Sequence, residues 1–306
     1  MRPNVNRALR YLAPNLITAT GIVFGLASIE ASHAGRYRDA AWFVIWAVLT
    51  DRLDGLVARL VRGTSELGVQ LDSLADLIAF GIAPAFLIYA SIGGSERLAF
   101  HDGTGRAALA AGAVCWVLGA SFRLARYNIT TEDEGKPRVF FGVPTTLAAG
   151  TTTIWYLVLL KYAPASGPIP APATGEVHLL GTWSTPDGAW TAFPIALYAG
   201  AFLMASNLRI PKLGLARSRW ATAFLSVNVV LGYACGMLRA YPDFMFWMPT
   251  AWLSIFLVWG QLSPAARAMK PPPIFPPVDP PPGREPLRPE DDLLEDADLR
   301  DDDLQF

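Results

Sequence analysis

Long apolar stretches recur along this 306-residue sequence and constrain its fold more than any other feature. About eight of them are long enough to cross the roughly 30 Å hydrocarbon core of a bilayer as helices. Hydrophobic residues make up 52% of the chain and charged residues 17%, which is too apolar for an ordinary soluble domain. The sequence therefore predicts an all-α fold, a polytopic integral membrane helical bundle with about eight transmembrane helices. The expected spans lie near residues 13–32, 39–60, 67–93, 106–126, 141–161, 192–207, 219–238 and 243–262.

The charge of the connections between these spans predicts their orientation, because cytoplasmic loops are enriched in Lys and Arg. Basic residues gather at the N-terminus and in the second, fourth and sixth connections, whereas the fifth, near 162–191, has none. We therefore expect an even number of spans in the inner (cell) membrane, with both termini in the cytoplasm. The first apolar run continues through Ser28, Ile29 and Glu30 without a convincing signal-peptide cleavage site, so we expect it to be retained.

The C-terminal residues differ sharply in composition from the rest of the chain. Residues 271–306 contain ten prolines followed by acidic runs, with 11 acidic and 3 basic side chains and a local charge of -8. Such a segment cannot bury enough apolar surface to fold. We predict a transmembrane domain over residues 1–265 and a disordered Pro-rich, acidic tail over 266–306. The preceding 270 residues carry +7, which suits contact with anionic membrane lipids and phosphorylated substrates. No nucleic-acid partner is expected.

Four aspartates interrupt the second and third apolar stretches: Asp51, Asp54, Asp72 and Asp76. A charge at the bilayer centre costs on the order of 2.5–3.5 kcal/mol, so these carboxylates need a compensating partner. Their spacings of three and four residues place each pair on one face of its helix. If the two helices form a hairpin around the 61–66 turn, the faces can converge into one pocket. Carboxylate oxygens suit Mg²⁺ or Mn²⁺, and a pair of such ions would need a bridging anion such as a substrate diphosphate.

Small residues accompany the aspartates on the same helices. Gly55 and Ala58 share the face of the first pair, and Gly68 lies one turn before Asp72, so a nucleotide could approach the backbone closely. These small residues and the four carboxylates together favour a ligand site. The alternative is a buried ion-pair network that fixes helix packing, formed by Asp51, Arg52, Asp54 and Arg59.

The two segments together read Asp51-x2-Asp54-Gly55-x2-Ala58-Arg59-x8-Gly68-x3-Asp72-x3-Asp76. This pattern resembles the full signature of the CDP-alcohol phosphatidyltransferase family, with eight defined positions at fixed spacing. The resemblance implies that Asp51, Asp54 and Asp72 hold the metal ions, with Asp76 also near them. It implies that Gly55, Ala58 and Arg59 line the CDP site. It further implies that Asp76 is the general base for the acceptor hydroxyl, whose oxygen attacks the lipid-linked phosphorus while CMP leaves.

Three further stretches resemble the phosphatidylserine synthase branch of that family. They are Pro14-Asn15-Leu16-Ile17-Thr18, Phe122-Arg123-Leu124-Ala125-Arg126-Tyr127-Asn128 and Phe141-Gly142-Val143-Pro144-Thr145. The similarity runs over residues 10–265 and implies CDP-diacylglycerol as donor, L-serine as acceptor and a homodimer. Thr145-Thr146-Leu147 departs from the branch, where a second proline or small residues are expected, and so does Gly21, where a polar Asn is expected.

The acceptor and nucleotide contacts each have two interpretations. Arg123, Arg126 and Asn128 could bind the carboxylate and ammonium of serine, or the two arginines could be ordinary cytoplasmic anchors. Asn15 either caps the first helix after Pro14 or touches the nucleotide.

Two other functions remain open from the sequence. The same transfer to another alcohol, such as glycerol 3-phosphate, an inositol phosphate or choline, keeps the signature and changes the acceptor. A cation-coupled transporter would use the buried carboxylates differently and would release no CMP.

Overall fold

The computed structural model describes residues 5–61, 66–133, 139–170, 175, 177–211, 219–267 and 271. The chain separates into two units, Met1–Pro271 and Pro272–Phe306. All described residues belong to the first unit, so the predicted disordered tail lies almost entirely outside them and stays a prediction.

The described part of the chain is mainly helical. The α-helices and short helical segments are α1 Val5–His33, α2 Tyr37–Val61, α3 Glu66–Asp76, η1 Leu77–Ile82, α4 Ala83–Gly93, α5 Gly103–Asp133, α6 Thr145–Lys161, η2 Asp187–Thr191, α7 Ala192–Ala205, α8 Arg219–Leu238, α9 Pro242–Met245, α10 Trp247–Leu262 and α11 Pro264–Arg267. Among these, η1 is a π-helix and η2 is a 3₁₀-helix. Strands β1 Val139–Phe141 and β2 Arg209–Pro211 pair antiparallel, with Phe140 opposite Ile210. The sequence did not predict this two-stranded sheet.

Every predicted apolar stretch lies wholly or mainly in a helix. By length and composition, four helices of the described residues could cross a membrane: Leu67–Gly93, Gly103–Asn128, Asp187–Ala205 and Pro242–Leu262. The chain is therefore an integral membrane protein of helical class, and the number of eight spans stays a prediction. The stretch 141–161 becomes helical only at Thr145. Pro144 explains this start, because the residue before a proline is biased away from the α conformation.

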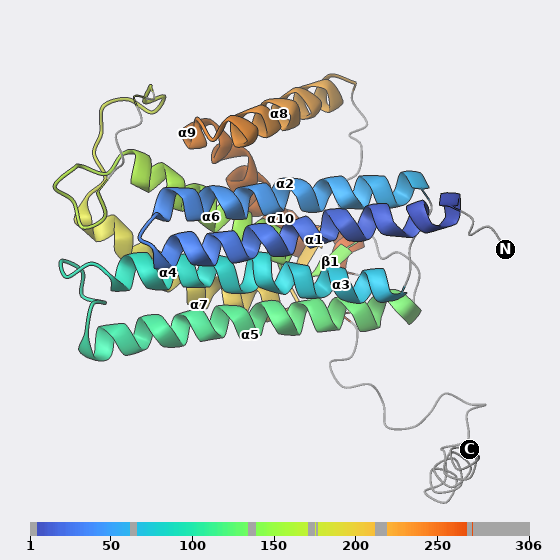
Figure 1. Ribbon diagram of the computed structural model, residues 1–306, viewed down its shortest axis with the longest axis horizontal. Helices are drawn as coiled ribbons and strands as arrows, with labels where there is room; N and C mark the ends of the chain where they lie inside the picture. Colours follow the sequence, from blue (N-terminus) through green and yellow to red (C-terminus); the bar gives the residue numbers. More distant parts are fainter. Residues whose placement is uncertain are drawn as a thin grey trace, which may run out of the picture. The chain divides into compact units, whose positions relative to one another are not determined.

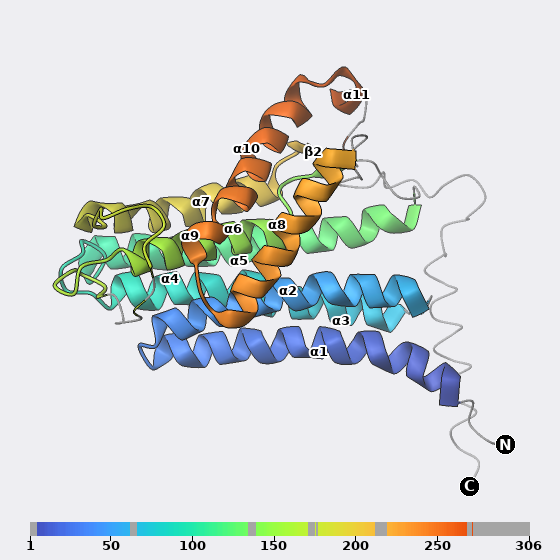
Figure 2. The same cartoon turned by 90° about the horizontal axis from the view of Figure 1, so that it is seen from above.

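Helices α1, α2, α4 and α5 run alongside one another (Figure 1). Helix α1 packs against α2 on one side and against α3, η1 and α4 on another, while α5 packs against α7, α4 and η1. Helices α8 and α10 cross this group at an angle (Figure 2). The end of α2, the start of α3 and the end of α5 lie at the same end of the bundle as the start of α1 (Figure 1).

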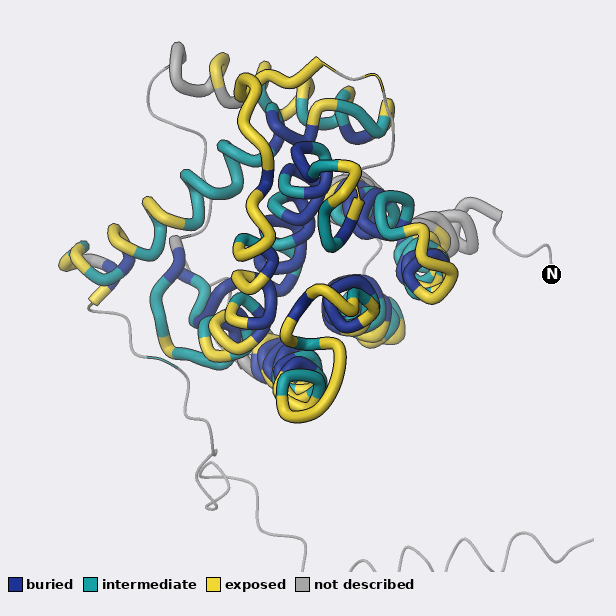
Figure 3. Tube along the Cα trace, turned by 90° about the vertical axis from the view of Figure 1, so that its left-hand side faces the viewer, coloured by how far each residue is buried: buried dark blue, intermediate teal, exposed yellow. Residues whose placement is uncertain are grey.

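The core contains large buried aromatic side chains, including Trp42, Trp116, Trp190 and Tyr156. Figure 3 shows buried residues where neighbouring helices face each other and exposed residues on the outer faces. Many of those outer residues are large and apolar, for example Phe202 on α7, Val230 on α8 and Ile255 on α10. In a bilayer such faces contact lipid tails, so their exposure costs nothing there.

Candidate active site

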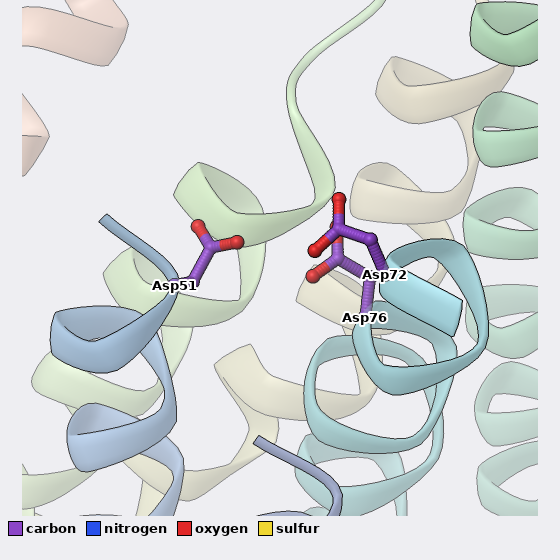
Figure 4. Close-up of side chains that lie close together, drawn as sticks. All are labelled: Asp51, Asp72 and Asp76. Atoms are coloured by element: carbon purple, nitrogen blue, oxygen red, sulfur yellow. The ribbon is translucent and has the colours of Figure 1, made fainter. Parts of the chain in front are cut away.

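Three of the four predicted aspartates come together in the structure. Asp51, Asp72 and Asp76 each offer a carboxylate oxygen, and these oxygens all lie within 4.8 Å of one another. Asp51 projects from α2 toward Asp72 and Asp76, which project from α3 on the other side of the site (Figure 4). Asp54 belongs to α2, but its side chain is outside the described part. The spacing thus predicted that Asp72 and Asp76 share the face of α3 that meets Asp51, and the place of Asp54 in the cluster stays a prediction.

Helix α1 explains how α2 and α3 present their carboxylates to one pocket. It packs against both helices, so the two aspartate faces meet alongside it. The three carboxylates line a small pocket that is partly open to solvent. Besides the three aspartates, its lining consists of small or hydroxylated residues and one aromatic residue, which are Thr18, Gly21, Ala47, Thr50, Ala75, Ala79 and Phe80. The small side chains leave space next to the carboxylates.

The carboxylates of the cluster repel one another, and bound cations would offset this repulsion. Two ionised carboxylates 4.8 Å apart repel by about 3.5 kcal/mol at an effective dielectric constant of about 20. Arg123 on α5 is buried, and Asp76 and Asp51 are the carboxylates with which its charge interacts. Clustered carboxylate oxygens are ligands that Mg²⁺ and Mn²⁺ prefer. The donor atoms present therefore fit a divalent metal site.

The start of α6 contributes two hydroxyl groups that sequence reasoning missed as site residues. Thr146 donates a hydrogen bond from Oγ1 to Oδ2 of Asp51 over 3.4 Å. Thr145 Oγ1 accepts one from Nη1 of Arg123 over 3.3 Å. The only signal in the sequence was their position directly after Pro144, where they depart from the related branch. The hydroxyls connect α6 to a carboxylate of the cluster and to the buried guanidinium.

The three predicted acceptor residues lie in different surroundings. The charge of Arg123 interacts with those of Asp76 and Asp51. Arg126 instead donates to four oxygens that join β1 to the end of α7, namely Phe141 O at 2.6 Å, Ser206 O at 2.9 Å, Asn207 Oδ1 at 3.1 Å and Ala205 O at 3.2 Å. Asn128 donates from Nδ2 to Ser73 Oγ over 2.8 Å, next to Asp72 in sequence. Arg123 is thus the member of this set best placed to meet an acceptor.

The predicted nucleotide residues lie on α1, α2 and α3. Gly68 is on α3, one turn before Asp72. Gly55, Ala58 and Arg59 are on α2, and their side chains lie outside the described part, so their CDP contacts stay predictions. The capping interpretation of Asn15 is wrong, because α1 begins at Val5 and continues through Asn15. The side chain of Asn15 also lies outside the described part, so its nucleotide contact stays a prediction.

A sequence profile of the CDP-alcohol phosphatidyltransferase family matches residues 11–185, more than half of the chain. The chain belongs to this family. The matched range begins within α1, extends beyond α6 and includes all the carboxylates of the cluster. Its members are metal-dependent enzymes, in agreement with the acidic cluster between α2 and α3.

Similar proteins have names that agree with this family. The chain is 35% identical over 201 residues to the CDP-diacylglycerol–serine O-phosphatidyltransferase of Helicobacter pylori strain J99, which covers 66% of this chain and 72% of that protein. It is 34% identical over 165 residues to the Mycobacterium leprae protein of the same name, covering 52% and 51% of the two chains. It is 34% identical over 147 residues to the archaetidylserine synthase of Methanothermobacter thermautotrophicus, covering 47% and 57%. For the last two relatives, the chain therefore spans only about half the length of the protein it matches.

Proposed function

We propose that this chain transfers the phosphatidyl group from CDP-diacylglycerol to the hydroxyl of L-serine, giving phosphatidylserine and CMP. The observation that carries the proposal is the meeting of Asp51, Asp72 and Asp76 beside a pocket, in a chain of the CDP-alcohol phosphatidyltransferase family. The names of the similar proteins support serine as acceptor over glycerol 3-phosphate, an inositol phosphate or choline.

The carboxylates of Asp51, Asp54, Asp72 and Asp76 would hold the metal ions, which we propose to be two Mg²⁺ or Mn²⁺ ions. Bound there, the ions would neutralise charge on the diphosphate and stabilise the departing phosphate of CMP. Thr146 keeps a carboxylate oxygen of Asp51 directed by its hydrogen bond. Gly68 leaves the backbone of α3 accessible to the nucleotide, and Asn15, Gly55, Ala58 and Arg59 complete the CDP site.

We assign the general base to Asp76. A carboxylate at the end of α3 can take the proton from the acceptor hydroxyl while the hydroxyl oxygen attacks phosphorus. The charge of Arg123 interacts with that of Asp76, and we assign Arg123 to the carboxylate of serine, since a guanidinium pairs well with a carboxylate. Arg126 would act at a distance by holding β1 and the end of α7, and Asn128 by its bond to Ser73.

The decisive experiment is an incorporation assay with purified protein. Labelled L-serine, CDP-diacylglycerol and Mn²⁺ or Mg²⁺ should give labelled phosphatidylserine with one CMP released per lipid formed. A parallel panel replaces serine by glycerol 3-phosphate, an inositol phosphate or choline, and a second panel replaces the donor by a CDP-activated archaeal ether lipid. Labelling of lipid by another alcohol and not by serine would reject the acceptor. Metal-dependent ion flux without CMP release would reject the enzyme.

We also propose the setting in which the reaction occurs. The charge of the connections supports an inner-membrane protein with both termini and the active site on the cytoplasmic side. Membership of the family supports a homodimer. The acidic tail is proposed to take no part in catalysis. Protease protection in vesicles of known orientation tests the topology, and light scattering of the detergent-solubilised protein tests the oligomeric state.

A further inference from the structure

The helix that carries Asp72 and Asp76 changes its winding directly after Asp76. Helix α3 ends at Asp76, and the six residues Leu77–Ile82 form the π-helix η1 before α4 begins at Ala83. The N–H of Ala83 donates to the carbonyl of Ile78, five residues earlier, whereas in an α-helix it would donate to the carbonyl four residues earlier. Short π-segments of this kind are rare and often occur at functional sites.

Pro84 gives a physical reason for this change of winding. In a regular α-helix the carbonyl of Phe80 would accept from the N–H of residue 84, but a proline has no N–H. The carbonyl instead accepts a hydrogen bond from Nε1 of Trp116 on α5, over 3.1 Å. Both Phe80 and Trp116 are buried, so this bond satisfies a polar group that water cannot reach.

Neighbouring helices hold the π-segment and the indole in place. A side chain at Gly200 on α7 would overlap the ring of Trp116, so the glycine makes room for the indole. On the other side, a Cβ at Gly25 on α1 would lie 2.9 Å from Cγ2 of Ile78. The π-segment is therefore packed closely between α1 and α5, and the indole lies between η1 and α7.

The extra residue of a π-segment changes which way the preceding helix faces. One residue corresponds to about 100° of rotation in an α-helix, so a regular helix in place of η1 would turn α3 by about that angle relative to α4. Such a rotation would point Asp72 and Asp76 away from Asp51. We propose that η1, held by the Trp116 hydrogen bond, sets the direction of these two carboxylates, and that Trp116 is a positioning residue for the metal site. This inference rests on the proposed function, because it concerns the positions of the same metal-binding aspartates.

The test compares two tryptophan substitutions. Trp116→Phe removes the indole N–H that bonds to Phe80. Trp190→Phe is the matched control, because Trp190 is equally buried and its Nε1 has no hydrogen-bond partner among the described residues. Mn²⁺ binding to the detergent-solubilised protein is measured by electron paramagnetic resonance in the presence of CDP, which requires no turnover. Loss of supporting hydrogen bonds around metal ligands weakens metal binding by about 10–100-fold. We expect about tenfold weaker binding for Trp116→Phe and unchanged binding for Trp190→Phe, although both lower the melting temperature.

A second variant tests the cause. Pro84→Ala restores an N–H at position 84 that can reach the Phe80 carbonyl, so η1 should relax toward an α-helix and Mn²⁺ binding should weaken. In that background Trp116→Phe should weaken binding further by less than about twofold, because the carbonyl has a main-chain donor. If Trp116→Phe does not fold, Pro84→Ala alone still decides, since wild-type Mn²⁺ binding by that variant contradicts the inference.

Three other results would overturn the inference. The first is wild-type Mn²⁺ affinity in a folded Trp116→Phe variant, and the second is an equal loss of affinity in Trp190→Phe. The third is a double variant of Trp116→Phe and Pro84→Ala whose loss of Mn²⁺ affinity equals the product of the two single losses. A wild-type protein that binds no Mn²⁺ in the presence of CDP refutes the proposed metal chemistry and this inference with it. Mn²⁺ binding that is normal in the wild type and in all variants refutes the inference alone.

Discussion

Replacing Asp72 by Asn should stabilise the metal-free protein while destroying its activity. The carboxylate oxygens of Asp51, Asp72 and Asp76 lie within 4.8 Å of one another, so Asp72 takes part in two of the three repulsive pairs. At an effective dielectric constant of about 20, each pair costs about 3.5 kcal/mol when both members are ionised. Asp72 is only half-buried, and counterions screen the charges, so we expect a net gain of about 1–3 kcal/mol in the free energy of unfolding.

The assay is thermal unfolding in detergent, first with EDTA and then with Mn²⁺ and CDP. A gain of 1 kcal/mol raises the melting temperature of a chain of about 150–250 residues by roughly 2–4 °C, so Asp72→Asn should unfold about 2–12 °C above the wild type in EDTA. Mn²⁺ and CDP should then stabilise the wild type by about 2.7 kcal/mol at a hundredfold excess over the dissociation constant, and the variant by much less. Turnover should be lost in both conditions.

The control is Asp102→Asn, which removes an exposed carboxylate just before α5 and should change neither melting temperature nor response to Mn²⁺. A lower melting temperature of Asp72→Asn in EDTA would show that Asp72 is held by favourable contacts rather than strained by repulsion. An equal response of wild type and variant to Mn²⁺ would show that Asp72 does not hold the ion. Either result refutes the account of the cluster as a site that cations complete.

Further variants separate the roles of the remaining residues. Asp76→Asn should lower turnover by about 10²–10⁴-fold while CDP-lipid still binds, because the amide keeps an oxygen that can face a metal ion but cannot take a proton, and near wild-type activity would refute the base assignment. Asp51→Ala should weaken both metal and CDP binding in a titration. Arg123→Lys should raise the KM for serine about tenfold with little change in melting temperature, whereas Arg126→Lys should lower the melting temperature because it loses contacts between β1 and α7. Equal KM effects would contradict this division. Deleting residues 271–306 should leave activity in detergent largely intact, and an inactive but folded truncation would assign the tail a role.

The sequence alone predicted the elements that carry the site, because two of its signals are local. Apolar length marks membrane helices, and the period of the α-helix places Asp72 and Asp76 on one face of α3. The prediction that Asn15 caps the first helix failed, because the residues before Pro14 are also helical and α1 begins at Val5. The sequence also missed the pairing of β1 with β2, which joins residues about 70 positions apart.

What the sequence determined by itself was the set of carboxylates, the shared face of Asp72 and Asp76 on α3 and, through the family signature, the reaction class. Their meeting point was decided by tertiary packing, since α1 lies against both α2 and α3 and lines the pocket with Thr18 and Gly21. The separate surroundings of Arg123 and Arg126, three residues apart on α5, were equally invisible in the sequence. A helix period shows which side chains share a face, but the partner across that face comes from another segment of the chain. The π-segment after Asp76 depends on both sequence and packing. Pro84 leaves the carbonyl of Phe80 without its main-chain donor, and Trp116 on α5 donates to that carbonyl instead.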